Sequence, residues 1–347
     1  MGTFDLVAVL VLTHPQYLRH DTGPHHPERP ARLEAVLAGI DAAGLEEALV
    51  HVAPTPAPRA ALERVHPASL LDALEDFCRT GGGAVDADTQ AGPESWDAAV
   101  LAAGAGLDAI ARLDAGEADA AFLAVRPPGH HATAQRSMGF CLLNNVAVAA
   151  AALADRGERV LIVDWDAHHG NGTQDVFYRD PRVVYISMHQ WPLYPGTGRL
   201  EDVGVGAGAG TTVNLPFPPG TTGDAYRAAV DEIVVPLASA WRPTWVLLSA
   251  GFDAHRADPL THMGLTAGDF ADLTDRLAVL APAGRRIAFL EGGYDLEALA
   301  ASAGATVAGL AGATWRPEPM SGPGPGREVV EAAVRLRAQV GAEPADT

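Results

Sequence analysis

The sequence predicts an α/β fold in which helices cover both faces of a mainly parallel sheet. Short apolar runs alternate along the chain with alanine-rich stretches of helical periodicity. The apolar runs are continuous, which is typical of strands buried on both faces. The chain has 347 residues, of which 48% are hydrophobic, so it is large enough to bury a full core. Strands that alternate with helices in this way indicate a parallel sheet with helical crossover connections.

Six runs have the strand pattern. Each is short and almost entirely apolar, and we expect each to form one strand of the sheet. They are Phe4–Leu12, Ala120–Val125, Val160–Trp165, Val183–Met188, Trp245–Ser249 and Ile287–Leu290.

Five stretches between or after these runs have the helical pattern. They are Ala31–Ala43, Ser95–Leu113, Val146–Arg156, Asp224–Ala240 and Ala267–Leu280. The last of them is preceded by Thr266, which together with Asp269 resembles a capping box at a helix start.

The C-terminal part of the chain differs in composition. The segment Pro317–Gly326 is rich in proline and glycine and is typical of a linker. We predict a single domain over residues 1–314. Residues 315–347 would contain the linker and a short, exposed helix near Glu328–Val340. The glycine-rich stretch Gly204–Gly210 lacks GxGxxG spacing, so it does not predict a dinucleotide site.

Composition excludes several classes of protein. The chain has 24 basic and 43 acidic residues, and its formal net charge of −19 argues against direct binding to nucleic acid or anionic membranes. The charge is compatible with cationic ligands such as polyamines or lysine-rich tails, although it could also serve solubility alone. The two cysteines, Cys78 and Cys141, argue against a disulfide framework. The N-terminal apolar run is too short to span a bilayer and lacks signal-peptide features, so we expect a cytoplasmic protein.

Four of the predicted strands end in reactive side chains. In chain order, these strands lead into the segments RPPGHH, DWDAHHGNG, AGFDAH and EGGY. Ligands of open parallel sheets bind beyond the carboxyl ends of the strands. We therefore expect the four segments to meet in one crevice.

The DWDAHH segment has the spacing of a metal site. Asp164, Asp166 and His168 follow one another at intervals of two residues, which places them on one face of an extended chain. A buried carboxylate is costly unless it is paired or binds a metal, and two carboxylates with an imidazole suit a divalent cation. The alternative is a solvated turn with local side-chain caps.

The other segments are less specific by themselves. His130 and His131 could be ordinary surface or core histidines, although the preceding Arg-Pro-Pro-Gly stiffens the turn that carries them. Asp253 could cap a helix, and Tyr294 could be a core or rim aromatic residue.

Six motifs taken together resemble the histone deacetylase family. They are HPERPARL (26–33), RPPGHHA (126–132), GFCLLNNVA (139–147), DWDAHHGNGTQ (164–174), SAGFDAH (249–255) and LEGGY (290–294). The resemblance covers about residues 4–312 and is to the class II-like bacterial members, which include amidohydrolases that act on acetyl-lysine or acetylpolyamines. It implies a three-layer α/β/α fold with a mainly parallel, eight-stranded sheet, shared with arginases, so that residues 1–314 would form the catalytic domain.

The resemblance also implies the metal ions. By motif position, Asp166, His168 and Asp253 would bind one catalytic Zn²⁺, and the same ligands would accept Fe²⁺. It further implies a K⁺ site near the catalytic centre. Its ligands would be the backbone carbonyls near Asp164, Asp166 and His168, the Ser187 hydroxyl and the Met188 carbonyl.

The catalytic groups carried over from the family are His130, His131 and Tyr294. The two histidines would serve as acid and base, and the tyrosine would donate to the developing oxyanion. Asp164 would orient His130, and Asn171 would orient His131. Because a carboxylate raises the pKa of a neighbouring imidazole more than an amide does, we expect His131 to be the general base and His130 to remain cationic.

The substrate channel can be located by the same resemblance. Phe140 and Tyr194 would flank the aliphatic stem of an acyl-lysine. Leu260 stands where polyamine-selective relatives resemble one another in carrying a glutamate, which weakens a polyamine interpretation. Arg32 stands where the family has an arginine beside an interior channel for acetate release.

Three functions remain open at this point. The first is zinc-dependent hydrolysis of the acetyl amide of acetyl-lysine, and the second is the same chemistry on an acetylpolyamine or another small metabolite. The third is acyl-lysine binding without catalysis, which Tyr294 argues against because family members of that kind carry histidine there. The expected partner is therefore an acetylated lysine or another acetylated amine, and the oligomeric state is undetermined.

Overall fold

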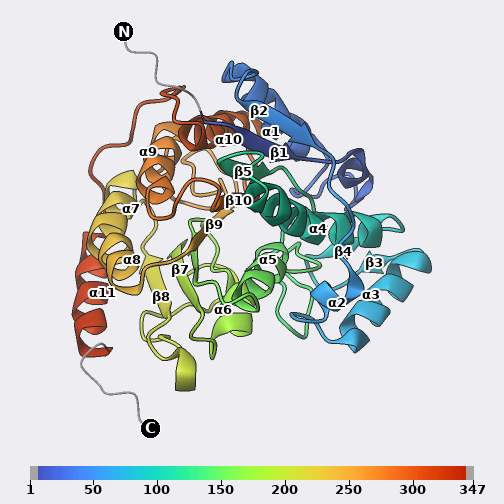
Figure 1. Cartoon of the computed structure of the whole chain (residues 1–347), viewed down its shortest axis with the longest axis horizontal. Coiled ribbons are helices and arrows are strands. Elements are labelled where there is room, and N and C mark those ends of the chain that lie inside the picture. Colours follow the sequence, from blue (N-terminus) through green and yellow to red (C-terminus); the bar gives the residue numbers. More distant parts are fainter. Residues whose placement is uncertain (1–6, 341–347) are drawn as a thin grey trace.

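An eight-stranded sheet forms the centre of the structure. The computed structural model describes residues 7–340 of the chain. The strands are β1 (Val9–Leu12), β2 (Leu49–Val52), β5 (Ala120–Leu123), β6 (Val160–Asp164), β7 (Val183–Gln190), β8 (Thr212–Phe217), β9 (Trp245–Ala250) and β10 (Arg286–Leu290). Their order is β2-β1-β5-β10-β9-β6-β7-β8, and every neighbouring pair is parallel (Figure 1). The predicted fold class is therefore confirmed.

Helices cover both faces of this sheet (Figure 1). They are α1 (Ala31–Ala42), α2 (Arg59–Leu62), α3 (Ala68–Arg79), α4 (Ser95–Asp114), α5 (Asn145–Ala154), α6 (Asn171–Phe177), α7 (Gly223–Ala229), α8 (Val235–Trp241), α9 (Ala267–Ala278), α10 (Leu296–Leu310) and α11 (Arg327–Val340). Helices α1, α10, α9 and α7 contact one another in that order, whereas α4 packs against α5. A small antiparallel hairpin, β3 (Gly83–Ala84) and β4 (Gln90–Ala91), lies outside the main sheet.

All six predicted strands are present, with ends that differ by a few residues. The part of the first prediction that covers residues 4–6 lies outside the described residues, and the observed strand is β1. Strands β2 and β8 were not predicted, because neither is a continuous apolar run. In β2, His51 is exposed at the edge of the sheet, and β8 contains Asn214 and Pro216.

The five predicted helices are also present, and one is interrupted. The stretch predicted as 224–240 forms α7 and α8 joined by a π-helical turn, Val230–Val234. Pro236, the second residue of α8, lacks the N–H that a regular helix would use, which accounts for a local change in hydrogen bonding. Thr266 and Asp269 form the expected capping box of α9.

Helix α10 was not predicted from the sequence, and most of its residues are small and apolar. The reason for this composition is its close contact with α1. A Cβ atom at Gly39 would collide with the backbone of Ala300, and one at Gly304 would collide with the backbone of Gly39. The two helices therefore touch at backbone distance.

The C-terminal helix is present as α11, but one expectation about it is wrong. Val330 and Ala333 are buried in the main hydrophobic core, where α11 contacts β8 and α7, so the helix is not exposed on that face. Before it, Glu318 accepts a hydrogen bond from the first N–H of α9. The division into residues 1–314 and 315–347 stays a prediction.

In residues 7–340, no helix combines the length and the apolar character that a membrane span requires.

Candidate active site

The four reactive segments follow four adjacent strands. RPPGHH follows β5, EGGY follows β10, AGFDAH follows β9 and DWDAHH begins at the end of β6, and these strands are neighbours at the centre of the sheet. Because the strands are parallel, their carboxyl ends lie at the same edge. The predicted crevice is therefore located there.

Two carboxylates and one imidazole meet at this edge. Asp166, His168 and Asp253 each direct one ligand atom to a common point, and these atoms lie within 4.8 Å of one another. The Nδ1 atom of His168 is 2.8 Å from an oxygen of Asp253 and 3.3 Å from one of Asp166. The backbone N–H groups of Ala167 and Gly292 donate to the two carboxylates, which fixes their orientation.

The surroundings of this cluster suit a divalent cation. A Cβ atom at Gly251 or Gly292 would collide with the carboxylate of Asp166, so glycines leave the space that the cluster needs. Burial and the neighbouring Asp166 raise the pKa of Asp253 to about 7. Two buried carboxylates that repel each other are stabilised when a cation lies between them. Two oxygens and one nitrogen leave further positions open, as a catalytic Zn²⁺ or Fe²⁺ requires.

His130 and His131 lie beside the cluster with different supporting groups. Their rings are 4.1 Å apart. Nδ1 of His130 is 3.0 Å from Asp164, and Nδ1 of His131 is 2.9 Å from the amide oxygen of Asn171. Burial lowers the pKa of His130, but the carboxylates of Asp166 and Asp164 outweigh burial and hold that pKa well above its ordinary value.

The second histidine has the opposite character. Burial and the neighbouring His130 and His168 hold the pKa of His131 well below its ordinary value. The carboxylate of Asp166 raises this pKa, and the amide of Asn171 raises it less, but neither outweighs burial and the two imidazoles. One ring is therefore suited to carry a charge, and the other is suited to accept a proton.

Of the residues proposed for K⁺, Asp164, Ser187 and Met188 lie on the adjacent strands β6 and β7, and Asp166 and His168 follow β6. Asp164 ends β6, and Ser187 pairs with it in the parallel ladder to β7. The Ser187 hydroxyl is 2.9 Å from Nδ1 of His189, and the Met188 carbonyl accepts a hydrogen bond from Tyr226. The potassium site stays a prediction.

A cavity of about 230 Å³ leads to the cluster. It is lined by Asp88, His131, Gly139, Phe140, His168, Leu193, Tyr194, Leu260 and Tyr294. All three residues proposed for the channel thus face the same space. Phe140 has a left-handed backbone, with φ of 66°, and its N–H donates to the Thr89 hydroxyl at 3.1 Å.

Tyr294 is held from several sides. Its backbone N–H donates to Asp258 at 2.7 Å, and its ring meets Phe140 edge-on at a centroid distance of 5.8 Å. The guanidinium carbon of Arg32 lies 4.9 Å from the centre of the Tyr294 ring. Arg32 is buried and donates to the carbonyls of Glu291 and Gly293, while the acetate channel inferred for it stays a prediction.

Comparison with known proteins identifies the family of the chain. A family model that describes the histone deacetylase domain matches residues 26–310. The chain belongs to the histone deacetylase family. The family resemblance of the six sequence motifs is therefore confirmed.

Individual relatives are similar to this chain over most of its length. It is 42% identical over 293 residues to a probable deacetylase of Archaeoglobus fulgidus, which covers 83% of this chain and 81% of the relative. It is 40% identical over 276 residues to a histone deacetylase-like amidohydrolase of Pseudomonas aeruginosa, over 78% of this chain and 73% of the relative. The crystal structure of the HDA15 HD domain superposes with a TM-score of 0.88 at 36% identity, over 96% of this chain and 94% of that one.

Several residues around this candidate site were not singled out from the sequence. Asp258 accepts the N–H groups of Tyr294 and Leu260, and Glu291 accepts those of Gly129 and His130. Glu291 is buried directly after β10. A charged residue at the end of a buried strand is the signal that could have identified it, as it did for Asp164.

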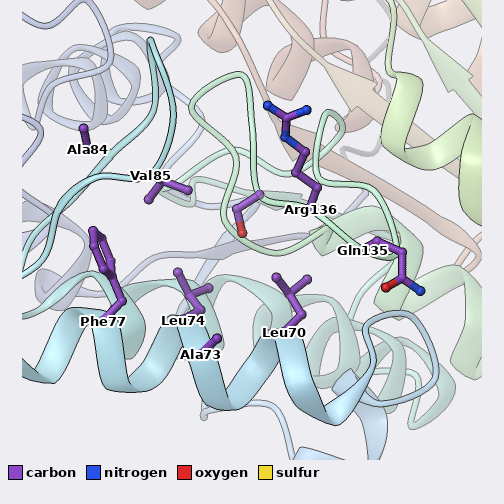
Figure 2. A pocket seen from close by; sticks show the side chains of 9 residues that line it. Leu70, Ala73, Leu74, Phe77, Ala84, Val85, Gln135 and Arg136 are labelled. Atoms are coloured by element: carbon purple, nitrogen blue, oxygen red, sulfur yellow. The ribbon is translucent and has the colours of Figure 1, made fainter.

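A second hollow, of about 280 Å³, lies apart from the metal cluster. Figure 2 shows Leu70, Leu74 and Phe77 projecting into it from one face of α3, opposite Val85 and Arg136. None of the residues that line it belongs to the metal cluster or the histidine pair. His131, His168 and Tyr294 line the first cavity instead.

Proposed function

We propose that this protein hydrolyses the acetyl amide of acetyl-lysine, in a protein or peptide, to the free amine and acetate. A bound Zn²⁺, held by Asp166, His168 and Asp253, would polarise the acetyl carbonyl and lower the pKa of water. The observation that carries the proposal is the cluster of two carboxylates and one imidazole beside the histidine pair, because its imidazole, His168, lines the cavity together with His131 and Tyr294. Deacetylase and amidohydrolase relatives support the reaction class.

His131 performs both proton transfers, and His130 and Tyr294 stabilise the negative charge that develops. His131, which is supported by a neutral amide, accepts a proton from the attacking water as a C–O bond forms. His130, which is supported by the Asp164 carboxylate, remains cationic and stabilises the developing negative charge. The Tyr294 hydroxyl donates to the oxyanion. The C–N bond then breaks, and the departing nitrogen receives the proton from His131, which leaves acetate and a free amine.

The cavity walls suit a lysine stem. Phe140 and Tyr194 present aromatic faces on which four methylene groups could be buried. Leu260 adds an apolar surface to the same cavity and provides no carboxylate for a distant ammonium group. These residues favour acetyl-lysine over an acetylpolyamine.

An acetylpolyamine or another small acetylated metabolite is the second candidate. The formal net charge of −19 and the carboxylate of Asp88, which lines the cavity, favour a substrate with additional positive charge. A non-catalytic acyl-lysine binder is less consistent with the presence of Tyr294.

The decisive experiment is a paired turnover assay on the zinc-loaded protein. An acetyl-lysine peptide and N-acetylputrescine are incubated in parallel, and the free amine is measured by mass spectrometry. The chain contains no lysine, so any lysine amine that appears comes from the substrate. We expect a higher kcat/KM for the peptide. A strong preference for N-acetylputrescine would assign the second function, and no turnover of either with metal bound would contradict both.

Metal removal tests the cofactor. We expect chelation to abolish turnover and Zn²⁺ to restore it, with Fe²⁺ tested under anaerobic conditions and K⁺ varied separately. Asp253→Asn should lower metal content and turnover together, and full metal occupancy in this variant would mean that the ligand set is wrong.

A further inference from the structure

Glu28 is a buried carboxylate that pairs with two buried arginines. Its side chain is fully buried, as are those of Arg32 and Arg126. Oε1 of Glu28 accepts from Nη1 of Arg32 at 3.0 Å and from Nε of Arg126, while Oε2 accepts from Nη2 of Arg126 at 2.7 Å. The Arg126 pair is therefore bidentate, which fixes the relative orientation of the two groups.

Each arginine leads to a different part of the active site. Arg126 begins the turn that carries His130 and His131, and it also donates to the backbone carbonyl of Tyr17. Arg32 donates to the carbonyl of Gly293 at 2.6 Å and lies over the ring of Tyr294. One carboxylate thus connects the histidine turn with the tyrosine turn.

Glu291 is a second buried carboxylate, and its contacts complete a closed ring of interactions that includes Glu28, Arg126 and Arg32. Oε2 of Glu291 accepts the backbone N–H groups of Gly129 at 2.7 Å and His130 at 3.1 Å. The backbone carbonyl of Glu291 accepts from Arg32, which returns to Glu28. The ring therefore passes through both turns and behind the groups that would perform the proton transfers.

We propose that Glu28 is a positioning residue, which acts through Arg126 and Arg32 to hold the histidine pair and Tyr294 in their relative geometry. The proposal rests on the proposed function, because it concerns the alignment of the same groups. Glu28 lines no part of the cavity, so it would not contact the substrate.

The negative charge of Glu28 is needed for this role. Two guanidinium groups lie in the fully buried region, and Glu28 is the carboxylate that touches both. Glu28→Gln keeps the shape of the side chain but removes its charge and places an NH₂ group against an arginine donor. A buried arginine that loses its partner changes its contacts, and a displacement of about 1 Å in catalytic groups lowers rates by about 100-fold.

The test compares Glu28→Gln with a matched control. Asp269→Asn also removes a fully buried carboxylate that pairs with an arginine, Arg227, but it does so at the capping box of α9. We expect Glu28→Gln to lower kcat by about 10- to 100-fold with KM changed by less than about threefold. Asp269→Asn should lower the melting temperature and leave kcat near the wild-type value. Metal content is measured in both variants.

A double-mutant cycle separates positioning from general damage. If Glu28 acts partly through Tyr294, the loss of kcat in Glu28→Gln combined with Tyr294→Phe should be smaller than the product of the two single losses. Independent effects that multiply would overturn the proposal, as would a Glu28→Gln enzyme with wild-type kcat.

If Glu28→Gln does not fold, Arg32→Lys is a second variant with which to test the proposal. It keeps the positive charge but cannot donate to two carbonyls and the carboxylate in the same fork geometry. We expect a folded protein with lowered kcat, and a wild-type kcat would contradict the proposal. An inactive wild-type protein would instead contradict the proposed function, so the two failures can be distinguished.

Discussion

His130 and His131 are neighbours in the sequence, yet different groups support their imidazole rings. A carboxylate lies behind the first and an amide behind the second. The residue types at positions 164 and 171 therefore determine which histidine stays cationic and which one transfers the proton in the mechanism that we propose. Tyr294 depends in a similar way on Asp258, which accepts its backbone N–H.

The Tyr294 hydroxyl can be tested by removing one oxygen atom. We expect Tyr294→Phe to lower kcat by about 100-fold or more, because an oxyanion donor is lost, while the metal content is unchanged. Tyr178→Phe, the same change outside the cavity, is the control. Equal activity of the Tyr294 variant and the wild type would remove Tyr294 from the mechanism.

His66 should make the stability of the protein depend on pH. It is buried and accepts the N–H of Asn144 at 2.9 Å, and burial lowers its pKa to about 4. The unfolded chain, with a pKa near 6.5, therefore binds a proton that the folded protein excludes. This stability is complete above about pH 6.5 and is lost as the pH falls toward 4.

The corresponding measurement is urea unfolding at pH 7 and pH 5. We expect His66 to account for a loss of about 2 kcal/mol in the free energy of unfolding between these values. His66→Gln should therefore lose less stability over this interval than the wild type does. An identical loss in both proteins would contradict the assignment.

At the scale of elements, different helices pack through different kinds of residue. Helices α1 and α10 meet through glycines, whereas α11 uses ordinary aliphatic packing against β8 and α7. The sequence predicts α11 correctly, but its short amphipathic pattern does not show which surface receives its apolar face. The packing of α11 therefore became visible only in the structure.

Two valines on α11 provide a matched test of this packing. Val330 is fully buried and Val334 is 37% exposed. We expect Val330→Ala to lower the free energy of unfolding by about 2 kcal/mol, because it removes two buried methyl groups. Val334→Ala should change it by less than about 0.5 kcal/mol. Equal effects in denaturant unfolding would mean that α11 is not packed in solution.

At the scale of the whole molecule, the strand order assembles the site. Segments that follow β5, β10, β9 and β6 are far apart in the sequence, but these strands are adjacent at the centre of the sheet. Residues from one segment alone could bind a cation only weakly. The parallel arrangement brings Asp253, which we propose as the third ligand, to Asp166 and His168 of the DWDAHH segment.

We expect the net negative charge of the protein to increase the capture of positively charged substrates. We expect the kcat/KM for an acetyl-lysine peptide with flanking arginines to fall about three- to tenfold between 0.05 and 0.5 M NaCl, because salt screens long-range attraction. A peptide with neutral flanks should change little. If both peptides respond equally, the net charge of −19 serves solubility rather than substrate capture.

The sequence by itself determined the fold class, the positions of the central strands and the segments that form the site. This was possible because buried parallel strands are continuous apolar runs, and because the reactive residues follow directly at their ends. Only the tertiary structure decided how these segments are held together. Arg126 meets Glu28 across 98 residues, and Glu291 meets Gly129 across 162. Such pairs leave no local periodicity, since their geometry depends on strand order and helix packing.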